Sequence, residues 1–116
     1  MSPSSAALGE RDGVDLTLAA LVDPVRRRSV ELLAERPRRA GELAEALGVS
    51  APVMSRHLRV LRRAELVEEE HPPFDARVRV YSLRAASMGA LKDWLADAEA
   101  GWTQQLGAFK NHMERR

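Results

Sequence analysis

The residues best suited to chemistry are four arginines between positions 51 and 63, a segment that holds no acidic residue. On a helix that turns about 100° per residue, Arg56, Arg59 and Arg63 form one stripe nearly opposite an apolar face. Arginine presents a planar fork of donors that matches phosphate oxygens and the acceptor edge of guanine. A merely solvated helix face usually mixes charges of both signs. The segment therefore predicts a helix that binds DNA.

The elements that would position this helix begin just before it. Residues 40–47 have apolar side chains at helical spacing, and Gly48 suits the left-handed residue that ends a helix. Ser50 is a favourable N-cap for a following helix over residues 51–63. Two helices joined by a short turn with a glycine form a helix-turn-helix, which makes residues 51–63 the predicted recognition helix.

A β-hairpin is predicted directly after the recognition helix. Residues 66–69 and 77–83 have strand-like sequences, and the prolines within residues 71–75 interrupt the pairing between them. In the returning strand, Arg77 and Arg79 alternate with valines and would face outward. We expect residues 66–83 to form a wing whose arginines reach DNA. A charged edge strand that prevents aggregation would show the same pattern.

The residues before the helix-turn-helix predict a tail and two helices. Residues 1–12 are rich in Ser, Gly and charge, and we expect a flexible tail. Apolar spacing predicts a short helix over residues 14–22. Asp23 and Pro24 then suit the N-cap and first turn of a helix over residues 24–34.

The last third of the chain, residues 85–116, predicts one long helix with an apolar stripe at spacings of three and four. We expect this stripe to bury against a second copy of the chain, because a two-fold interface joins the same surface of both copies. The predicted dimer interface comprises Leu18, Leu91, Trp94, Leu95, Ala98, Trp102, Leu106 and Phe109. The aromatic residues among them could instead line a pocket for a small-molecule inducer.

Composition limits the class of protein. The 116 residues are 45% hydrophobic and 30% charged, which fits one globular domain. The absence of cysteine excludes disulfides and thiolate metal sites. No apolar run is long enough to span a membrane, and the first twelve residues lack the features of a signal peptide, so we expect a cytoplasmic protein. The net charge of +1 hides ten basic and four acidic residues in 24–63, followed by five acids and no base in 64–75.

The segment GELAEALGVSAPVMSRHLRVLRRAELV, followed by VRVYSL and preceded by LVDPVRRRSVELLAE, resembles the ArsR/SmtB family of winged helix-turn-helix repressors. The resemblance covers roughly residues 16–84 and implies that the C-terminal helix dimerises. It implies that residues early in the recognition helix contact bases and phosphates, that two later arginines contact phosphates, and that the wing touches the backbone or minor groove. With the arginine stripe, the predicted DNA-binding residues are Ser50, Ala51, Pro52, Ser55, Arg56, His57, Arg59, Arg62, Arg63, Arg77 and Arg79. His57 could instead be a hydrogen-bonded core residue.

This chain departs from the family pattern in three ways. It has Glu65 where the family commonly has glycine, so a left-handed conformation there would cost about 1 kcal/mol. The wing tip reads HPPFDA in place of a Gly-Arg type of tip. The cysteines of one family metal site are absent, and Asp93 and Asp97 lack the histidines of another. The three histidines of the chain show no ligand spacing, so we expect no metal and no cofactor.

These patterns predict a mainly α-helical protein with a small β-hairpin. Residues 13–84 would form a winged helix-turn-helix, with residues 85–116 as a dimerisation helix of the same domain. No catalytic motif is present, so we expect no enzyme. The predicted function is a homodimeric, sequence-specific repressor that binds double-stranded DNA. The acidic segment 64–75 and the low net charge favour an alternative, a winged-helix module that binds protein instead.

Overall fold

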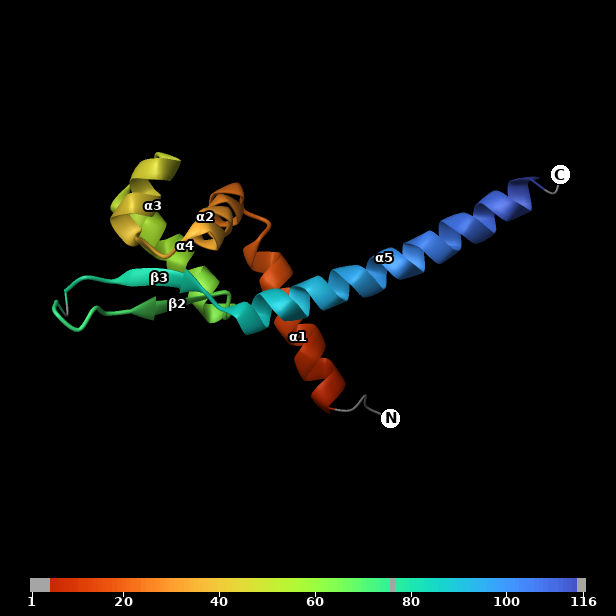
Figure 1. Cartoon of the computed structure of the whole chain (residues 1–116), viewed down its shortest axis with the longest axis horizontal. Coiled ribbons are helices and arrows are strands. Elements are labelled where there is room, and N and C mark those ends of the chain that lie inside the picture. Colours follow the sequence, from red (N-terminus) through yellow and green to blue (C-terminus); the bar gives the residue numbers. More distant parts are fainter. Residues whose placement is uncertain (1–4, 76, 115–116) are drawn as a thin grey trace.

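The computed structural model describes residues 5–75 and 77–114, which form a mainly helical domain with a small sheet and one long projecting helix (Figure 1). This is the predicted winged helix-turn-helix. The elements in chain order are α1 (Ser5–Ala20), α2 (Pro24–Glu35), β1 (Arg38–Arg39), α3 (Ala40–Leu47), α4 (Ala51–Arg63), β2 (Val67–Glu70), β3 (Val80–Leu83) and α5 (Ala85–Glu114).

The first helix is longer than the sequence indicated. It begins at Ser5 rather than Val14, so the prediction of a flexible tail is wrong for residues 5–12, and residues 1–4 lie outside the described part. The Ser, Pro, Gly and charged residues within 1–12 favoured a tail, yet a glycine such as those at 9 and 13 costs a helix only about 1 kcal/mol. The Ala, Leu, Glu and Arg residues around them are strong helix formers, which explains why the helix continues through both glycines.

The ends of the helices follow the predicted caps. The Asp23 carboxylate accepts hydrogen bonds from the backbone N–H groups of Val25 and Arg26, at 2.8 and 3.2 Å. Gly48 ends α3 in the left-handed conformation, with φ 67° and ψ 33°. The Ser50 hydroxyl oxygen accepts from the N–H of Val53 at 3.4 Å and begins α4. These caps fix the turn between α3 and α4 and hence the direction of the recognition helix.

The sheet has three antiparallel strands in the order β1-β3-β2. The two-residue strand β1 was not predicted, because two residues show no alternation. The prediction that the returning strand begins at Arg77 is wrong, since β3 begins at Val80. A turn precedes it, in which the N–H of Asp75 donates to the Pro72 carbonyl and the N–H of Val78 donates to the Asp75 carbonyl. Prolines cannot donate to a strand ladder, so the pairing stops before them.

The core lies where α2, α3 and α4 meet the sheet. The large apolar side chains with less than 2% exposure are Leu43, Met54, Leu58, Leu61 and Leu66. Three of these come from one face of α4, so the recognition helix is held through its inner face. Its outer face is thereby left for solvent or a partner.

Helix α5 extends far beyond this core (Figure 1). The radius of gyration is 18.9 Å, whereas a compact chain of this length has about 13 Å. The side chains from Glu99 to Glu114 are all exposed. The far part of α5 therefore has no packing partner among the described residues of its own chain.

None of the described helices is both long and apolar enough to cross a membrane.

The turn after α4 carries a strained residue. Glu65 has φ 59°, a conformation that side chains with a Cβ rarely adopt. We expect Glu65→Gly to raise the free energy of unfolding by about 0.5–1 kcal/mol, because the relief of strain exceeds the entropy that glycine adds to the unfolded chain. Urea denaturation would measure this. Glu65→Ala retains the strain and is the control; an equal gain in that variant would contradict the explanation.

Candidate nucleic-acid interface

The outer face of α4 carries the predicted arginine row. Arg56, Arg59 and Arg63 are exposed, and they lie on the opposite side of the helix from the buried leucines. Within residues 13–75 and 77–114, whose side chains the structure describes, none of the three forms an ion pair. Three cations on one helix face that are not in ion pairs repel one another and gain by meeting phosphates. The angular prediction for these arginines therefore agrees with their placement.

The start of α4 presents small side chains. Ser50, Ala51, Pro52 and Ser55 are all exposed. A helix N-terminus carries unsatisfied backbone N–H groups and a partial positive charge, which suit a phosphate. Small side chains there let the DNA backbone approach closely. The predicted contacts at this end are thus sterically accessible.

His57 lies between α2 and α4 rather than on the arginine row. Its side chain is only 17% exposed, and Nδ1 is 3.2 Å from an Arg26 guanidinium nitrogen. Arginine cannot accept a hydrogen bond, so Nδ1 is the acceptor in this contact. Arg26 also donates to the Ala20 carbonyl at 2.6 Å, which ties the end of α1 to this site. The contacts favour the core interpretation of His57 over a DNA contact.

Asp23 supports the same junction. Its carboxylate lies 4.0 Å from His57 Nδ1. Partial burial raises the pKa of Asp23, but the N–H groups of Arg26 and Val25, with the charge of Arg26, outweigh it and hold the pKa below its ordinary value. The carboxylate is therefore ionised at neutral pH and can anchor the first turn of α2.

Glu69 of β2 is a site residue that sequence reasoning missed. Its carboxylate contacts four side chains, although it is only 9% exposed. Arg62 of α4 and Arg79 of the wing form ion pairs with it, and His71 and Tyr81 also lie within contact distance. Burial raises the pKa of Tyr81, and the neighbouring Glu69 charge adds to this rise. The signal was available, because alternation along a strand places Glu69 on the same face as buried Val67.

The two arginines of the wing differ in exposure and in their ion-pair partners. The Arg77 side chain is 95% exposed and lies 3.7 Å from the Asp75 carboxylate. Arg79 is 63% exposed but is paired with Glu69 at 3.3 Å. Phe74, at the tip, is 83% exposed. Arg77 is thus the wing cation with the most freedom to reach a DNA backbone.

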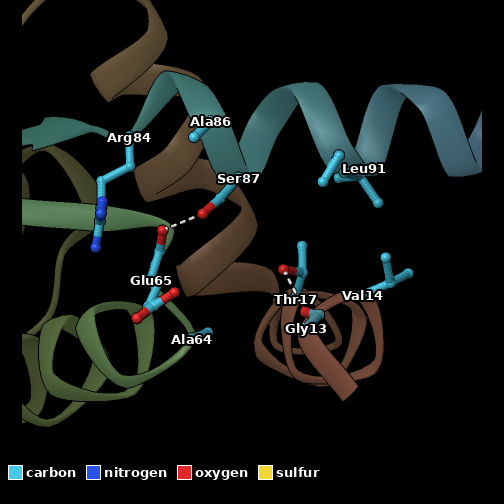
Figure 2. A pocket seen from close by; sticks show the side chains of 10 residues that line it. Gly13, Val14, Thr17, Ala64, Glu65, Arg84, Ala86, Ser87 and Leu91 are labelled. Carbon is cyan, nitrogen blue, oxygen red and sulfur yellow. Dashed lines mark hydrogen bonds between the residues drawn. The ribbon is translucent and has the colours of Figure 1, made fainter. Parts of the chain in front are cut away.

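A hollow of about 250 Å³ lies where α1, the end of α4 and the start of α5 meet (Figure 2). The Ser87 hydroxyl donates to the Glu65 carbonyl and joins α5 to the turn that follows the recognition helix. The residues that line this α1–α5 hollow are Gly13, Val14, Thr17, Ala64, Glu65, Arg84, Ala86, Ser87, Ala90 and Leu91. A change in the position of α5 would therefore alter the position of the backbone at the end of α4.

The predicted dimer residues divide into two groups. Trp94, Leu95, Trp102, Leu106 and Phe109 are between 43% and 68% exposed, which is unusual for such large apolar side chains. The others are covered by their own chain: Leu91 is 8% exposed, and Leu18 and Ala98 are half-buried. Leu91 therefore offers little surface to a second copy, because the contact of α5 with α1 already buries it.

Comparisons with known proteins agree with this geometry. The family model described as bacterial regulatory protein, arsR family, matches residues 23–69. The chain is 41% identical over 95 residues to the HTH-type transcriptional regulator Rv2034 of Mycobacterium tuberculosis, which covers 82% of this chain and 83% of the relative. It is 30% identical over 76 residues to the transcriptional repressor SdpR of Bacillus subtilis, which covers 66% of this chain and 81% of that protein.

The fold has solved counterparts. An ArsR-like transcriptional regulator from Rhodococcus sp. RHA1 aligns with a TM-score of 0.72 and 27% identity, over 89% of this chain and 94% of the other. The sequence matches span the helix-turn-helix, and the structural match also includes much of the remainder. The chain belongs to the arsR family of bacterial regulatory proteins, and it is a DNA-binding transcriptional regulator rather than an enzyme.

Proposed function

We propose that this regulator is a homodimeric repressor. Each protomer would place α4 in a major groove of double-stranded DNA, and the wing would contact the backbone or the minor groove. The observation that carries the proposal is the row of Arg56, Arg59 and Arg63, exposed cations without an ion pair in the described part of the chain. Repression would follow where the operator overlaps a promoter and the bound protein blocks polymerase.

The exposed stripe of α5 supports the dimer. A two-fold axis would bury Trp102, Leu106 and Phe109 of both copies together, and their burial would add about 25 cal/mol for each Å² removed from water. Two recognition helices held this way would meet half-sites about one DNA turn apart, roughly 34 Å. The similarity to a protein named a transcriptional repressor supports the sign of the regulation.

The test is binding to the DNA upstream of its own coding sequence, measured by fluorescence anisotropy across a salt series. We expect binding that unrelated DNA does not displace and that weakens about a thousandfold between 50 and 200 mM salt, because phosphate contacts release counterions. Equal displacement by unrelated DNA would contradict an operator at that position. No binding at low salt would favour the protein-interaction module, whose apolar contacts respond little to salt.

Two further parts of the proposal concern where and how the regulator acts. We place the protein in the cytoplasm, together with the DNA that it would bind. A small-molecule inducer stays a prediction. The α1–α5 hollow suits such a ligand, because its walls join the dimerisation helix to Glu65, in the turn that follows the recognition helix (Figure 2).

A further inference from the structure

We propose that Glu69 is the positioning residue that sets how selective this regulator is for its operator. Its carboxylate would clamp the recognition helix to the wing and would keep Arg62 and Arg79 from binding the phosphates of any DNA. The inference rests on the proposed function, since it concerns how the same interface discriminates between DNA sequences.

Both carboxylate oxygens of Glu69 are occupied. Oε2 lies 2.7 Å from Arg62 Nη1 and accepts a hydrogen bond from the Tyr81 hydroxyl at 3.4 Å. Oε1 lies 3.3 Å from Arg79 Nε and 3.3 Å from His71 Nε2. The partners come from the last turn of α4, from β3 and from the wing loop on both sides. One side chain therefore joins the last turn of α4 to β3 and to the two ends of the wing loop.

The burial of the Glu69 carboxylate keeps Arg62 and Arg79 paired with it. The carboxylate is 9% exposed, while Arg62 and Arg79 are 52% and 63% exposed. If one of these arginines turned to a DNA phosphate, the Glu69 carboxylate would lose that partner while it remained desolvated. It would also lie close to the negative charge of the phosphate. Loss of one partner from a buried ion pair is strongly unfavourable, whereas a surface phosphate contact gains less. The pairs therefore persist on DNA.

Selectivity for the operator depends on how many cations remain free to contact DNA phosphates. Phosphate contacts bind every sequence alike, and each adds about 0.9 to the slope of log affinity against log salt. Because Arg62 and Arg79 are held back, fewer cations contribute to binding of unrelated DNA. The fixed angle between α4 and the wing meanwhile favours a DNA shape that presents both contacts at once.

The decisive experiment compares Glu69→Gln with Glu70→Gln. Both variants remove one negative charge from the same strand, but Glu70 is exposed and forms no ion pair within the described residues. Affinity for the operator and for an unrelated duplex of equal length would be measured across a salt series. In Glu69→Gln we expect tenfold tighter binding of unrelated DNA, a slope steeper by about 1–2 per protomer and a lower operator-to-unrelated ratio. Glu70→Gln should leave the ratio unchanged.

A second background identifies the side chains responsible. In a protein that already carries Arg62→Ala and Arg79→Ala, Glu69→Gln should not steepen the salt dependence further. An equal steepening in that background would assign the effect to the general field of the protein. Equal slopes and ratios for Glu69→Gln and Glu70→Gln in the otherwise unchanged protein would overturn the inference.

The clamp can also be tested without DNA. Backbone amides of residues 77–83 should exchange hydrogen faster in Glu69→Gln than in Glu70→Gln, because the wing loses its tie to α4. Arg79→Gln, a change at an exposed side chain, should have the same effect if Glu69→Gln fails to fold. Unchanged exchange in these variants would overturn the clamp. A parent protein that binds no DNA would instead contradict the proposed function, while the exchange data would still decide on the clamp.

Discussion

Operator affinity is expected to fall by about a thousandfold when Arg56 and Arg59 are both replaced with alanine. A good arginine contact in a DNA groove or on a phosphate contributes about 1–3 kcal/mol, so two such contacts contribute about 2–6 kcal/mol, and the middle of that range corresponds to this factor. Both side chains are exposed and form no ion pair in the described part of the chain, so the fold should be unaffected. Alanine is also a strong helix former.

Anisotropy titration with the operator would measure the loss. The matched control is Lys92→Ala with Lys110→Ala, which removes the same charge from exposed positions on α5. That control should change affinity only slightly, because these lysines lie outside the interface proposed for DNA. If the double arginine variant binds the operator as well as the parent does, the assignment of α4 as the recognition helix is wrong.

Replacing Trp102 and Leu106 with glutamate is expected to convert the proposed dimer into monomers of 12.9 kDa. Each protomer would bring two charges into a surface that becomes buried on association, and the two-fold axis doubles the effect. The two side chains are 66% and 68% exposed in the single chain, so the change should spare the domain core. Operator affinity should fall by more than a hundredfold, because two linked half-sites become one.

Sedimentation equilibrium would give the mass of the variant, and circular dichroism would verify that it is folded. The control is Ala100→Glu, which adds a charge on the same exposed helix. Position 100 points about 160° away from Trp102 around the helix axis, so the added charge lies off the apolar stripe. This variant should remain a dimer. A parent protein with the mass of a single chain would contradict the proposed assembly directly.

Local patterns predicted the helices that carry the candidate interface. The apolar spacing within α4, the N-cap Ser50 and the left-handed Gly48 are all properties of a few adjacent residues, and each agrees with the structure. Features that depend on distant partners were harder. Strand β1 exists because Arg38 pairs with Tyr81, and nothing within two residues indicates this. The start of β3 at Val80 depends on how the turn around Asp75 closes.

The same division applies to the candidate site. Arg56, Arg59 and Arg63 could be placed by angle alone, because exposure on a helix follows from its period. Arg62 and Arg79 looked equivalent to them in the sequence, yet both are paired with Glu69. That pairing depends on β2 lying beside the last turn of α4, which no local pattern encodes. The placement of His57 between two helices is likewise a property of their packing.

The exposed apolar stripe along α5 has a consequence for regulation, because the concentration of the protein in the cell would itself set how much dimer is available to bind the operator. In the proposed dimer, the apolar stripe with Trp102, Leu106 and Phe109 is covered only when another copy arrives, so the species that binds two half-sites grows with the square of the protomer level while protomers are in excess. Doubling synthesis would raise that species up to fourfold, and halving it would reduce it to a quarter. The operator would therefore switch over a narrow range of gene dosage without any ligand.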